Sequence, residues 1–302
     1  MKKFTTLCLA LFLASAALFG FYQFRQKTVR DHSKPVFNIE EGPLTVSVHD
    51  GKEALLEGVA ASDAKDGDVT DSIIVESVSP FTSDGRRIVR YAAYDNSGHV
   101  THARRELLYS DYEPPRFMLS KPLTFPLNSL DPLEGLRVID SIDGDITEKI
   151  QVLSPVDVNI GIAGKYTAQL HVSNSAGGFF NLPVTIEVYD PLIREELPAI
   201  ELTEYIVYLE KGSPFNEKGY IKSVTVNGEE YNKDLVAIKS SVDTNVPGCY
   251  EVEYSIEDTE GGTGIGENRL YVVVTDSSEG VMYRSSSASA DPGAAPEEGG
   301  AN

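Results

Sequence analysis

The chain has 302 residues, of which 41% are hydrophobic, and its formal net charge is −20. The length suggests two or three domains, and the hydrophobic fraction is high enough for packed cores, which argues against wholesale disorder. The negative charge repels phosphate backbones, so nucleic acid is a poor partner for this chain. The two cysteines, Cys8 and Cys249, lie far apart and provide neither an intradomain disulfide nor a cysteine zinc site.

The N-terminal segment, residues 1–30, predicts export. After two lysines a mostly apolar run extends from Phe4 to Phe24, and about 20 such residues are the length that a helix needs to cross a membrane. One interpretation is a signal-anchor, which makes the protein a single-pass membrane protein with an extracytoplasmic C-terminal region. The other is a signal peptide cleaved at the small residues 14–16, which makes the protein secreted.

An acidic motif occurs twice after this segment. It reads D-x-x-D-G-D-[VI]-T-x-x-I, and it spans residues 63–73 and again residues 140–150. Self-similarity of this kind indicates a repeated structural unit.

A second set of landmarks follows the motif and occurs three times. A glycine begins a stretch of alternating apolar and polar residues, and a polar residue followed by a second glycine ends it. Such alternation is typical of a half-buried strand, and the flanking residues are typical of turns. The landmarks are Gly85, Asp95 and Gly98; Gly164, Asn174 and Gly177; and Gly248, Asp258 and Gly261.

Short strands at regular spacing, with a proline-led strand at the start of each unit, predict an all-β fold of three β-sandwiches in tandem. The expected domains are residues 34–111, residues 112–190 and a divergent third copy, residues 197–276. The tail, residues 277–302, is rich in Ser, Gly and Pro and is expected to be disordered.

These residues resemble the bacterial immunoglobulin-like domain first described in a pesticidal crystal protein. The resemblance covers about residues 34–276, and it is clearest in the first two copies. It implies immunoglobulin-like sandwiches of the kind that bacterial surface and secreted proteins use as spacers and adhesion modules. Counted back from Gly248 without gaps, the third copy has Val224 at the position of Asp140 and Tyr231 at that of Thr147. We therefore expect any role of the acidic cluster to be weakened or lost there.

The acidic motif allows two interpretations. Closely spaced carboxylates repel one another, and Ca²⁺ outside the cell is a natural compensating ion, since it takes about 6–8 oxygen ligands. Alternatively, the motif is a solvated turn in which Asp-Gly supplies a positive φ and the other aspartates cap backbone N–H groups. The candidate calcium ligands are Asp63, Asp66, Asp68 and Asp95 in the first copy, and Asp140, Asp143, Asp145 and Asn174 in the second.

The motifs of hydrolases and nucleotide-binding enzymes, such as G-x-S-x-G, H-E-x-x-H and the P-loop, do not occur in the sequence. We expect a non-enzymatic cell-surface protein that serves as a spacer, an adhesion module or a protein-binding scaffold, with an extracellular protein or glycan as its partner. One alternative is a carbohydrate-binding accessory module, for which the tyrosine-rich third repeat could line a groove, although core packing is the commoner use of tyrosine. A further alternative, a cell-wall enzyme, needs paired carboxylates or a metal triad that these repeats do not offer.

Overall fold

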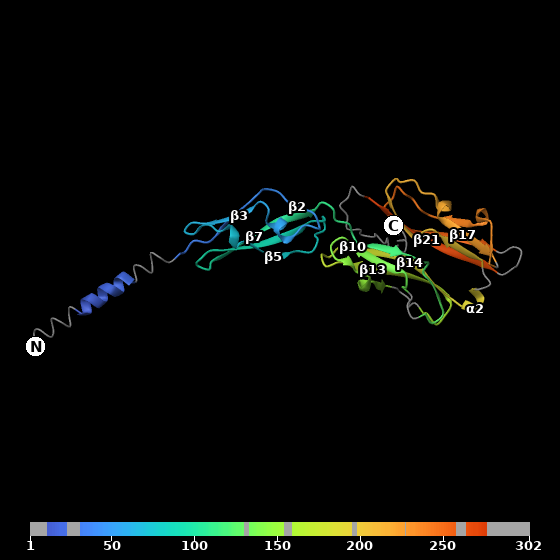
Figure 1. Ribbon diagram of the computed structural model, residues 1–302, viewed down its shortest axis with the longest axis horizontal. Coiled ribbons are helices and arrows are strands. Elements are labelled where there is room, and N and C mark those ends of the chain that lie inside the picture. Colours follow the sequence, from blue (N-terminus) through green and yellow to red (C-terminus); the bar gives the residue numbers. More distant parts are fainter. Residues whose placement is uncertain are drawn as a thin grey trace, which may run out of the picture. The chain divides into compact units, whose positions relative to one another are not determined.

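The computed structural model of the chain describes residues 11–22, 31–129, 133–153, 159–194, 198–226, 228–257 and 264–276. About half of these residues lie in strands, and six sheets form three sandwiches in sequence order (Figure 1), which confirms the predicted all-β fold. Contacts divide the chain into two compact units: unit 1 is Met1–Ser79 with Arg86–Ser110, and unit 2 is Pro80–Gly85 with Asp111–Asn302.

The predicted N-terminal span, Phe4 to Phe24, lies only partly within the described residues. Residues 11–22 are helical. Among the helices of the described residues, none has the length and apolar character that a membrane crossing demands. The tail at 277–302, the landmarks Asp258 and Gly261, and Asn227 of the third acidic motif lie outside the described residues.

The first sandwich, in unit 1, packs a three-stranded sheet with the order β1-β3-β4 on a four-stranded sheet with the order β2-β7-β6-β5. Alternation along β6 builds the core: Val89, Tyr91 and Ala93 are fully buried, whereas Arg90 is exposed. The strands are β1 (Val36–Ile39), β2 (Leu44–Val46), β3 (Val59–Asp63), β4 (Gly67–Asp68), β5 (Ile74–Val78), β6 (Arg87–Tyr94) and β7 (Val100–Tyr109), with 3₁₀ turns at Lys52–Leu56 and Thr70–Ser72.

The acidic motif forms the turn between β3 and β4 and the segment that follows. Gly67 there has a φ of 77°, a left-handed conformation that glycine adopts without strain. The Thr70 hydroxyl accepts a hydrogen bond from the backbone N–H of Ala61 at 3.1 Å, and Val69 beside it is buried in the core. The second copy, residues 140–150, repeats this pairing and these contacts, so the motif shapes the chain in both copies.

Unit 2 contains the second and third sandwiches, with sheet orders β11-β10-β8 and β12-β13-β14-β9, then β15-β17-β18 and β16-β21-β20-β19. The second consists of β8 (Arg116–Leu119), β9 (Thr124–Pro126), β10 (Leu136–Asp140), β11 (Gly144–Asp145), β12 (Gln151–Leu153), β13 (Gly164–Ser173) and β14 (Phe179–Tyr189). After the short helix α2 (Pro191–Arg194), the third consists of β15 (Ala199–Leu202), β16 (Ile206–Glu210), β17 (Ile221–Val226), β18 (Glu229–Glu230), β19 (Ala237–Ser240), β20 (Gly248–Glu257) and β21 (Ile265–Thr275). Further 3₁₀ turns lie at Thr147–Lys149, Glu217–Tyr220 and Lys233–Leu235.

Each four-stranded sheet is completed by a short strand that runs parallel to the last strand of its sandwich. β2 pairs in this way with β7, β9 with β14, and β16 with β21. The preceding strand of each sandwich belongs to the other sheet. The chain therefore enters through one sheet, crosses at once to the other, and lies there beside the strand by which it leaves.

The gap-free alignment of the acidic motif in the third copy is wrong. Backbone pairing puts Val226, rather than Val224, at the position of Asp140, because the turn that follows is shorter. Tyr231 accordingly stands at the place of Ile146 and not at that of the threonine. Since Val226 is apolar and buried, the leading carboxylate of the motif is lost in this copy, as expected.

The second and third sandwiches share a core within unit 2, where they lie side by side (Figure 1). Strand β21 is buried on both faces. Leu270, Val272 and Val274 belong to the core of the third sandwich, whereas Tyr271 and Val273 belong to that of the second. Full burial of one such apolar side chain contributes about 1.5–3 kcal/mol, so these two sandwiches stabilise each other.

Two tyrosines of the third repeat join this packing by hydrogen bonds to the backbone of the second sandwich. The Tyr271 hydroxyl accepts a bond from the N–H of Thr185 at 3.1 Å and donates one to its carbonyl at 3.0 Å. Tyr208 makes the same pair of bonds with Phe117, at 2.8 and 3.2 Å. Both tyrosines therefore serve packing between sandwiches and do not line a ligand groove.

Candidate functional site

Three of the four ligands predicted in the first copy gather at one end of the first sandwich. Asp63 ends β3, Asp66 lies in the turn after it, and Asp95 follows β6. The fourth, Asp68, serves the fold instead: its carboxylate accepts the backbone N–H of Thr70 at 2.9 Å.

Two further residues that the sequence reasoning did not include belong to this cluster. Asp31, which precedes β1, has a ligand-capable atom within 4.8 Å of those of Asp63 and Asp66, and the same holds for the set of Asp31, Asp95 and His99. The sequence did hold a signal for Asp31, because it stands before the proline-led strand of its repeat, as Asp111 does in the next one.

Asp63 carries the most unusual atom of the cluster. The residue is only 5% exposed. Its Oδ1 accepts bonds from the backbone N–H groups of Lys65 at 2.8 Å and Asp66 at 3.1 Å, and from the Ser33 hydroxyl at 3.0 Å. Its Oδ2 is buried, and no described residue gives it a hydrogen bond. Leaving a buried polar atom unsatisfied costs about 1–3 kcal/mol, and more if it is charged.

Asp95 joins the cluster through Asp31 and His99. Its side chain is fully buried. Oδ1 accepts the backbone N–H groups of Ser97 and His99, both at 2.8 Å, and Oδ2 lies 2.6 Å from the His99 ring Nδ1. Asp66 is held beside it, since one of its oxygens accepts the N–H of Asn96 at 2.9 Å.

The second sandwich repeats this geometry with one decisive change. Asp140 Oδ1 accepts backbone N–H groups of its own turn, as Asp63 Oδ1 does. Asn174, at the place of Asp95, accepts the N–H groups of Ala176 and Gly178 with Oδ1 at 3.0 and 2.8 Å. Its Nδ2 then donates to Asp140 Oδ2 at 2.9 Å. The oxygen that is orphaned in the first sandwich is thus satisfied by an amide in the second.

The remaining predicted ligands of the second copy are also compensated by neighbouring groups. Asp143 accepts the N–H and hydroxyl of Ser175 at 2.7 and 2.6 Å, and Lys149 lies 2.9 Å from it. Asp145 is turned toward Arg137, at 2.7 Å, so the structure does not bring it into the cluster.

Three carboxylates of the first cluster, those of Asp31, Asp63 and Asp95, have lowered pKa values and are ionised at neutral pH. The backbone N–H of Lys65 holds the pKa of Asp63 below its ordinary value despite burial. For Asp95, burial alone raises the pKa, but the backbone N–H and ring of His99 outweigh burial and leave the pKa below its ordinary value. The Ser33 hydroxyl lowers the pKa of Asp31 in the same way. A proton shared between these groups therefore does not relieve their repulsion.

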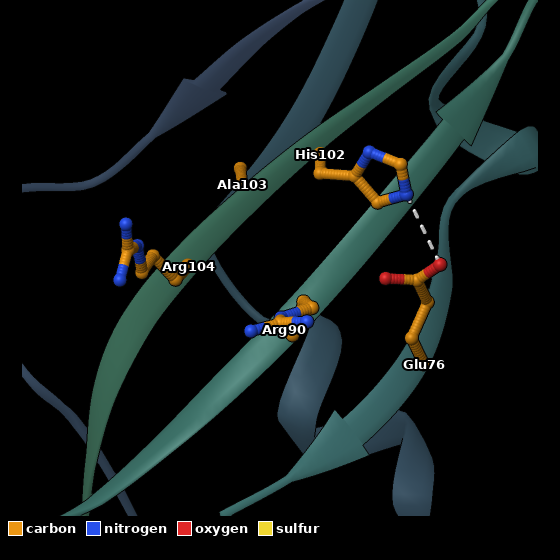
Figure 2. A pocket seen from close by; sticks show the side chains of 5 residues that line it. All are labelled: Glu76, Arg90, His102, Ala103 and Arg104. Carbon is orange, nitrogen blue, oxygen red and sulfur yellow. Dashed lines mark hydrogen bonds and ion pairs between the residues drawn. The ribbon is translucent and has the colours of Figure 1, made fainter.

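A second candidate surface lies on the outer face of the four-stranded sheet of unit 1. Figure 2 shows Arg90 of β6 and Arg104 of β7 with Glu76 and His102, which together with Ala103 line a shallow hollow of about 430 Å³. His102 Nε2 lies 3.2 Å from Glu76 Oε1. Arg90 and Arg104 are exposed and directly opposite in the strand register. Like charges in this arrangement destabilise a strand pair, so an external negative group placed here would stabilise it.

Residues 202–269 match the model of a protein family described as bacterial surface protein, Ig-like domain. This match confirms the predicted family for the third copy. Because this copy has lost the leading carboxylate, the family likeness does not depend on the acidic cluster.

Two curated relatives match a larger part of the chain. It is 29% identical over 213 residues to the pesticidal crystal protein Cry22Aa of Bacillus thuringiensis, a match that covers 68% of this chain and 28% of that protein. It is 27% identical over 176 residues to an uncharacterised 81.3 kDa protein of Acholeplasma phage L2, covering 57% of this chain and 22% of that one. The chain thus spans about a quarter of the length of these relatives.

Among solved structures, the lipoprotein BT2262 of Bacteroides thetaiotaomicron is 34% identical. That match covers 26% of this chain and 38% of the other, with a TM-score of 0.23.

Proposed function

We propose that this chain, which carries a bacterial surface Ig-like domain at residues 202–269, is a non-catalytic extracytoplasmic protein that acts as a scaffold for an acidic protein partner. The observation that carries the proposal is the exposed pair Arg90 and Arg104, which faces outward from a chain with a net charge of −20. Arginine is enriched at protein interfaces because its guanidinium binds carboxylates in a planar, two-pronged geometry.

A protein partner is favoured over a carbohydrate. Sugar and small-molecule sites are mostly concave and lined by aromatic side chains, but the arginine surface is shallow, and no Phe, Tyr or Trp stands among the described residues that line it. Two tyrosines of the third repeat, Tyr208 and Tyr271, pack between the second and third sandwiches, so these two do not form a sugar platform. A flat, charged strand face suits the acidic side chains of another protein.

The architecture of unit 2 supports a scaffold role. Two sandwiches with a common core form a body larger than either alone. Such a body holds its own surfaces in a fixed relation, which suits a scaffold.

The N-terminal segment is proposed as the tether. Its support is the sequence: an apolar run from Phe4 to Phe24 preceded by lysines. The intact mass of the protein isolated from membranes of its native host tests this proposal. A mass that lacks the segment would contradict a permanent anchor and indicate a secreted form.

The docking surface is tested by charge reversal of Arg90→Glu with Arg104→Glu. The matched control, Lys52→Glu with Lys218→Glu, changes the net charge equally at exposed sites elsewhere. Each full-length protein is cross-linked on native cells, and its captured partners are identified by mass. We expect the wild type and the control to capture the same acidic protein at low salt and to release it at high salt, whereas the arginine variant fails to capture it.

Equal capture by the arginine variant would contradict this docking surface. Capture of polysaccharide without protein would favour the carbohydrate-binding alternative. Turnover of cell-wall material in a zymogram would contradict the non-catalytic assignment.

A further inference from the structure

We propose that the first sandwich binds one divalent cation between Asp31, Asp63, Asp66 and Asp95, that calcium is the ion it fits, and that the second sandwich has an internal substitute for this ion. Asp31, Asp63 and Asp66 bring ligand-capable atoms within 4.8 Å of one another, which is the span of a single coordination sphere. A group of acidic side chains occurs in metal sites and in ordinary turns alike. The decisive atom is a carboxylate oxygen that does not take part in the hydrogen bonds of the turn.

That oxygen is Oδ2 of Asp63. The turn is completed by Oδ1, which accepts two backbone N–H groups and the Ser33 hydroxyl. Oδ2 has no such role: it is buried, and it has no hydrogen-bond partner in the described part of the chain. A buried carboxylate oxygen without a donor is costly, and a positive charge against it removes this cost.

In the second sandwich an amide group of the protein occupies the position that we assign to the cation in the first. There the matching oxygen of Asp140 receives the Asn174 amide at 2.9 Å. In the first sandwich the matching atom of Asp95 is a carboxylate oxygen, because Asp95 Oδ1 binds its loop as Asn174 Oδ1 does. In the first sandwich this oxygen of Asp95 pairs with the His99 ring at 2.6 Å, so Asp63 Oδ2 receives from the described residues no bond like the one that Asn174 gives to Asp140. A divalent cation against Asp63 Oδ2 supplies the missing attraction.

The second sandwich also compensates its other carboxylate internally. Lys149 lies 2.9 Å from Asp143. At the position of Lys149 in the first copy stands Ser72, which has no charge to offer Asp66. Both changes, amide to carboxylate and lysine to serine, leave the first cluster more negative and point to the same conclusion.

The donor set favours calcium over a transition metal. Four carboxylates offer hard oxygen ligands, which calcium prefers. Zinc sites draw most of their ligands from His and Cys, and His99 is the one residue of these types in the cluster groups of the described residues. Asp31 precedes the first strand, so binding would also fasten the chain that leads into the sandwich.

The proposal is tested on the full chain in detergent micelles by calorimetric titration and thermal unfolding, with EGTA or with about 1–5 mM Ca²⁺. We expect heat of binding with a single site and a rise in the melting temperature of the first sandwich by about 4 °C or more. Asp95→Asn recreates the amide of the second sandwich. It should remove the calcium response and unfold, in EGTA, at or above the temperature of the wild type.

Two matched variants complete the test. Asp68→Asn alters a carboxylate of the same motif that lies outside the cluster, and it should keep the calcium response. Asn174→Asp introduces the carboxylate pair in the second sandwich and should lower the melting temperature of unit 2 in EGTA.

Three results would overturn the proposal. The first is the absence of both heat and stabilisation with calcium in the wild type. The second is a calcium response that persists in Asp95→Asn. The third is binding of Zn²⁺ but not Ca²⁺, with loss of that binding in His99→Gln, which would assign the site to a transition metal.

Discussion

Among single residues, Asp95 and Asn174 differ by one group and change the chemistry of otherwise matching loops. Each side chain uses Oδ1 to hold its own loop, so the substitution leaves the local fold intact. The difference falls on the second atom. In the second sandwich it is an amide that binds the neighbouring aspartate, whereas in the first it is a carboxylate oxygen paired with His99, and Asp63 Oδ2 has no hydrogen-bond partner among the described residues. The choice between Asn and Asp at this position thus decides whether the buried aspartate oxygen receives a hydrogen bond from its own sandwich.

Asp145 provides a pH test at this scale. Bonds from Thr147 and Arg137 lower its pKa from 3.8 to about 2 in the folded protein. A lowered folded-state pKa stabilises the fold above the unfolded-state pKa, and this contribution is lost as the pH falls from about 3.8 to about 2. Asp145→Asn should therefore lower the urea midpoint of unit 2 at pH 7, with a difference from wild type that shrinks through this window.

The matched control for this measurement is Asp243→Asn, which changes an aspartate in a turn of the third sandwich. A difference between Asp145→Asn and wild type that stays constant down to pH 2 would show that the ion pair with Arg137 does not contribute through its charge.

Among the secondary-structure elements, β21 determines how the third sandwich is packed. A strand at the surface of a sandwich alternates apolar and polar residues, but the run Leu270 to Val274 is apolar throughout. An unbroken run is typical of a strand buried on both faces. The second sandwich covers the outer face of this strand, which removes a large apolar surface from water.

Tyr271→Phe tests the polar part of this contact. The change removes both bonds to Thr185 and leaves its buried N–H and carbonyl without this partner. We expect a loss of about 1–3 kcal/mol in the free energy of unfolding of unit 2. The control Tyr94→Phe, on a tyrosine that is 38% exposed, should change stability by less than about 0.5 kcal/mol. Equal effects of the two changes would contradict the role given to Tyr271.

Cys249 reports on the same contact. Its Sγ lies 3.8 Å from the carbonyl oxygen of Asn181 in the second sandwich, and burial raises its pKa to about 11. Because the thiolate is the reactive form, a thiol reagent at pH 8 should modify Cys249 only as fast as the sandwiches separate. The measurement uses Cys8→Ser to leave a single thiol, and Lys218→Cys as the exposed control. Rapid labelling of native Cys249 would contradict the shared core.

For the whole molecule, the sandwiches differ in independence. The first belongs to unit 1, and the other two lie in unit 2 with a joint core. Domains with separate cores unfold in separate steps, whereas elements that share a core unfold together. Scanning calorimetry should therefore show two transitions, with the larger enthalpy in the one assigned to unit 2. Three transitions would contradict the joint core, and Tyr271→Phe should shift only the larger one.

The strands and turns that follow from local, repeating sequence patterns could be predicted from the sequence. The alternation in β6 and the Asp-Gly turns at Gly67 and Gly144 are local patterns, and they indicate strands and turns without any knowledge of the neighbours. The packing of β21 and the role of Asp31 depend on segments distant in sequence. The sequence patterns at these positions are an unbroken apolar run and a recurring aspartate before a proline. Neither pattern identifies the distant residues that β21 and Asp31 contact in the fold.

The parallel pairs β2–β7, β9–β14 and β16–β21 have a consequence for a protein held at one end and pulled at the other. The chain enters each sandwich by a strand of the other sheet and then runs beside the strand by which it leaves. Once the entering strand is pulled free, traction on the ends slides the two parallel strands past each other. The hydrogen bonds of the pair lie across the direction of pull and must rupture together instead of one after another. The longest pair joins Ile206–Glu210 to Tyr271–Thr275, so the third sandwich should yield last under load.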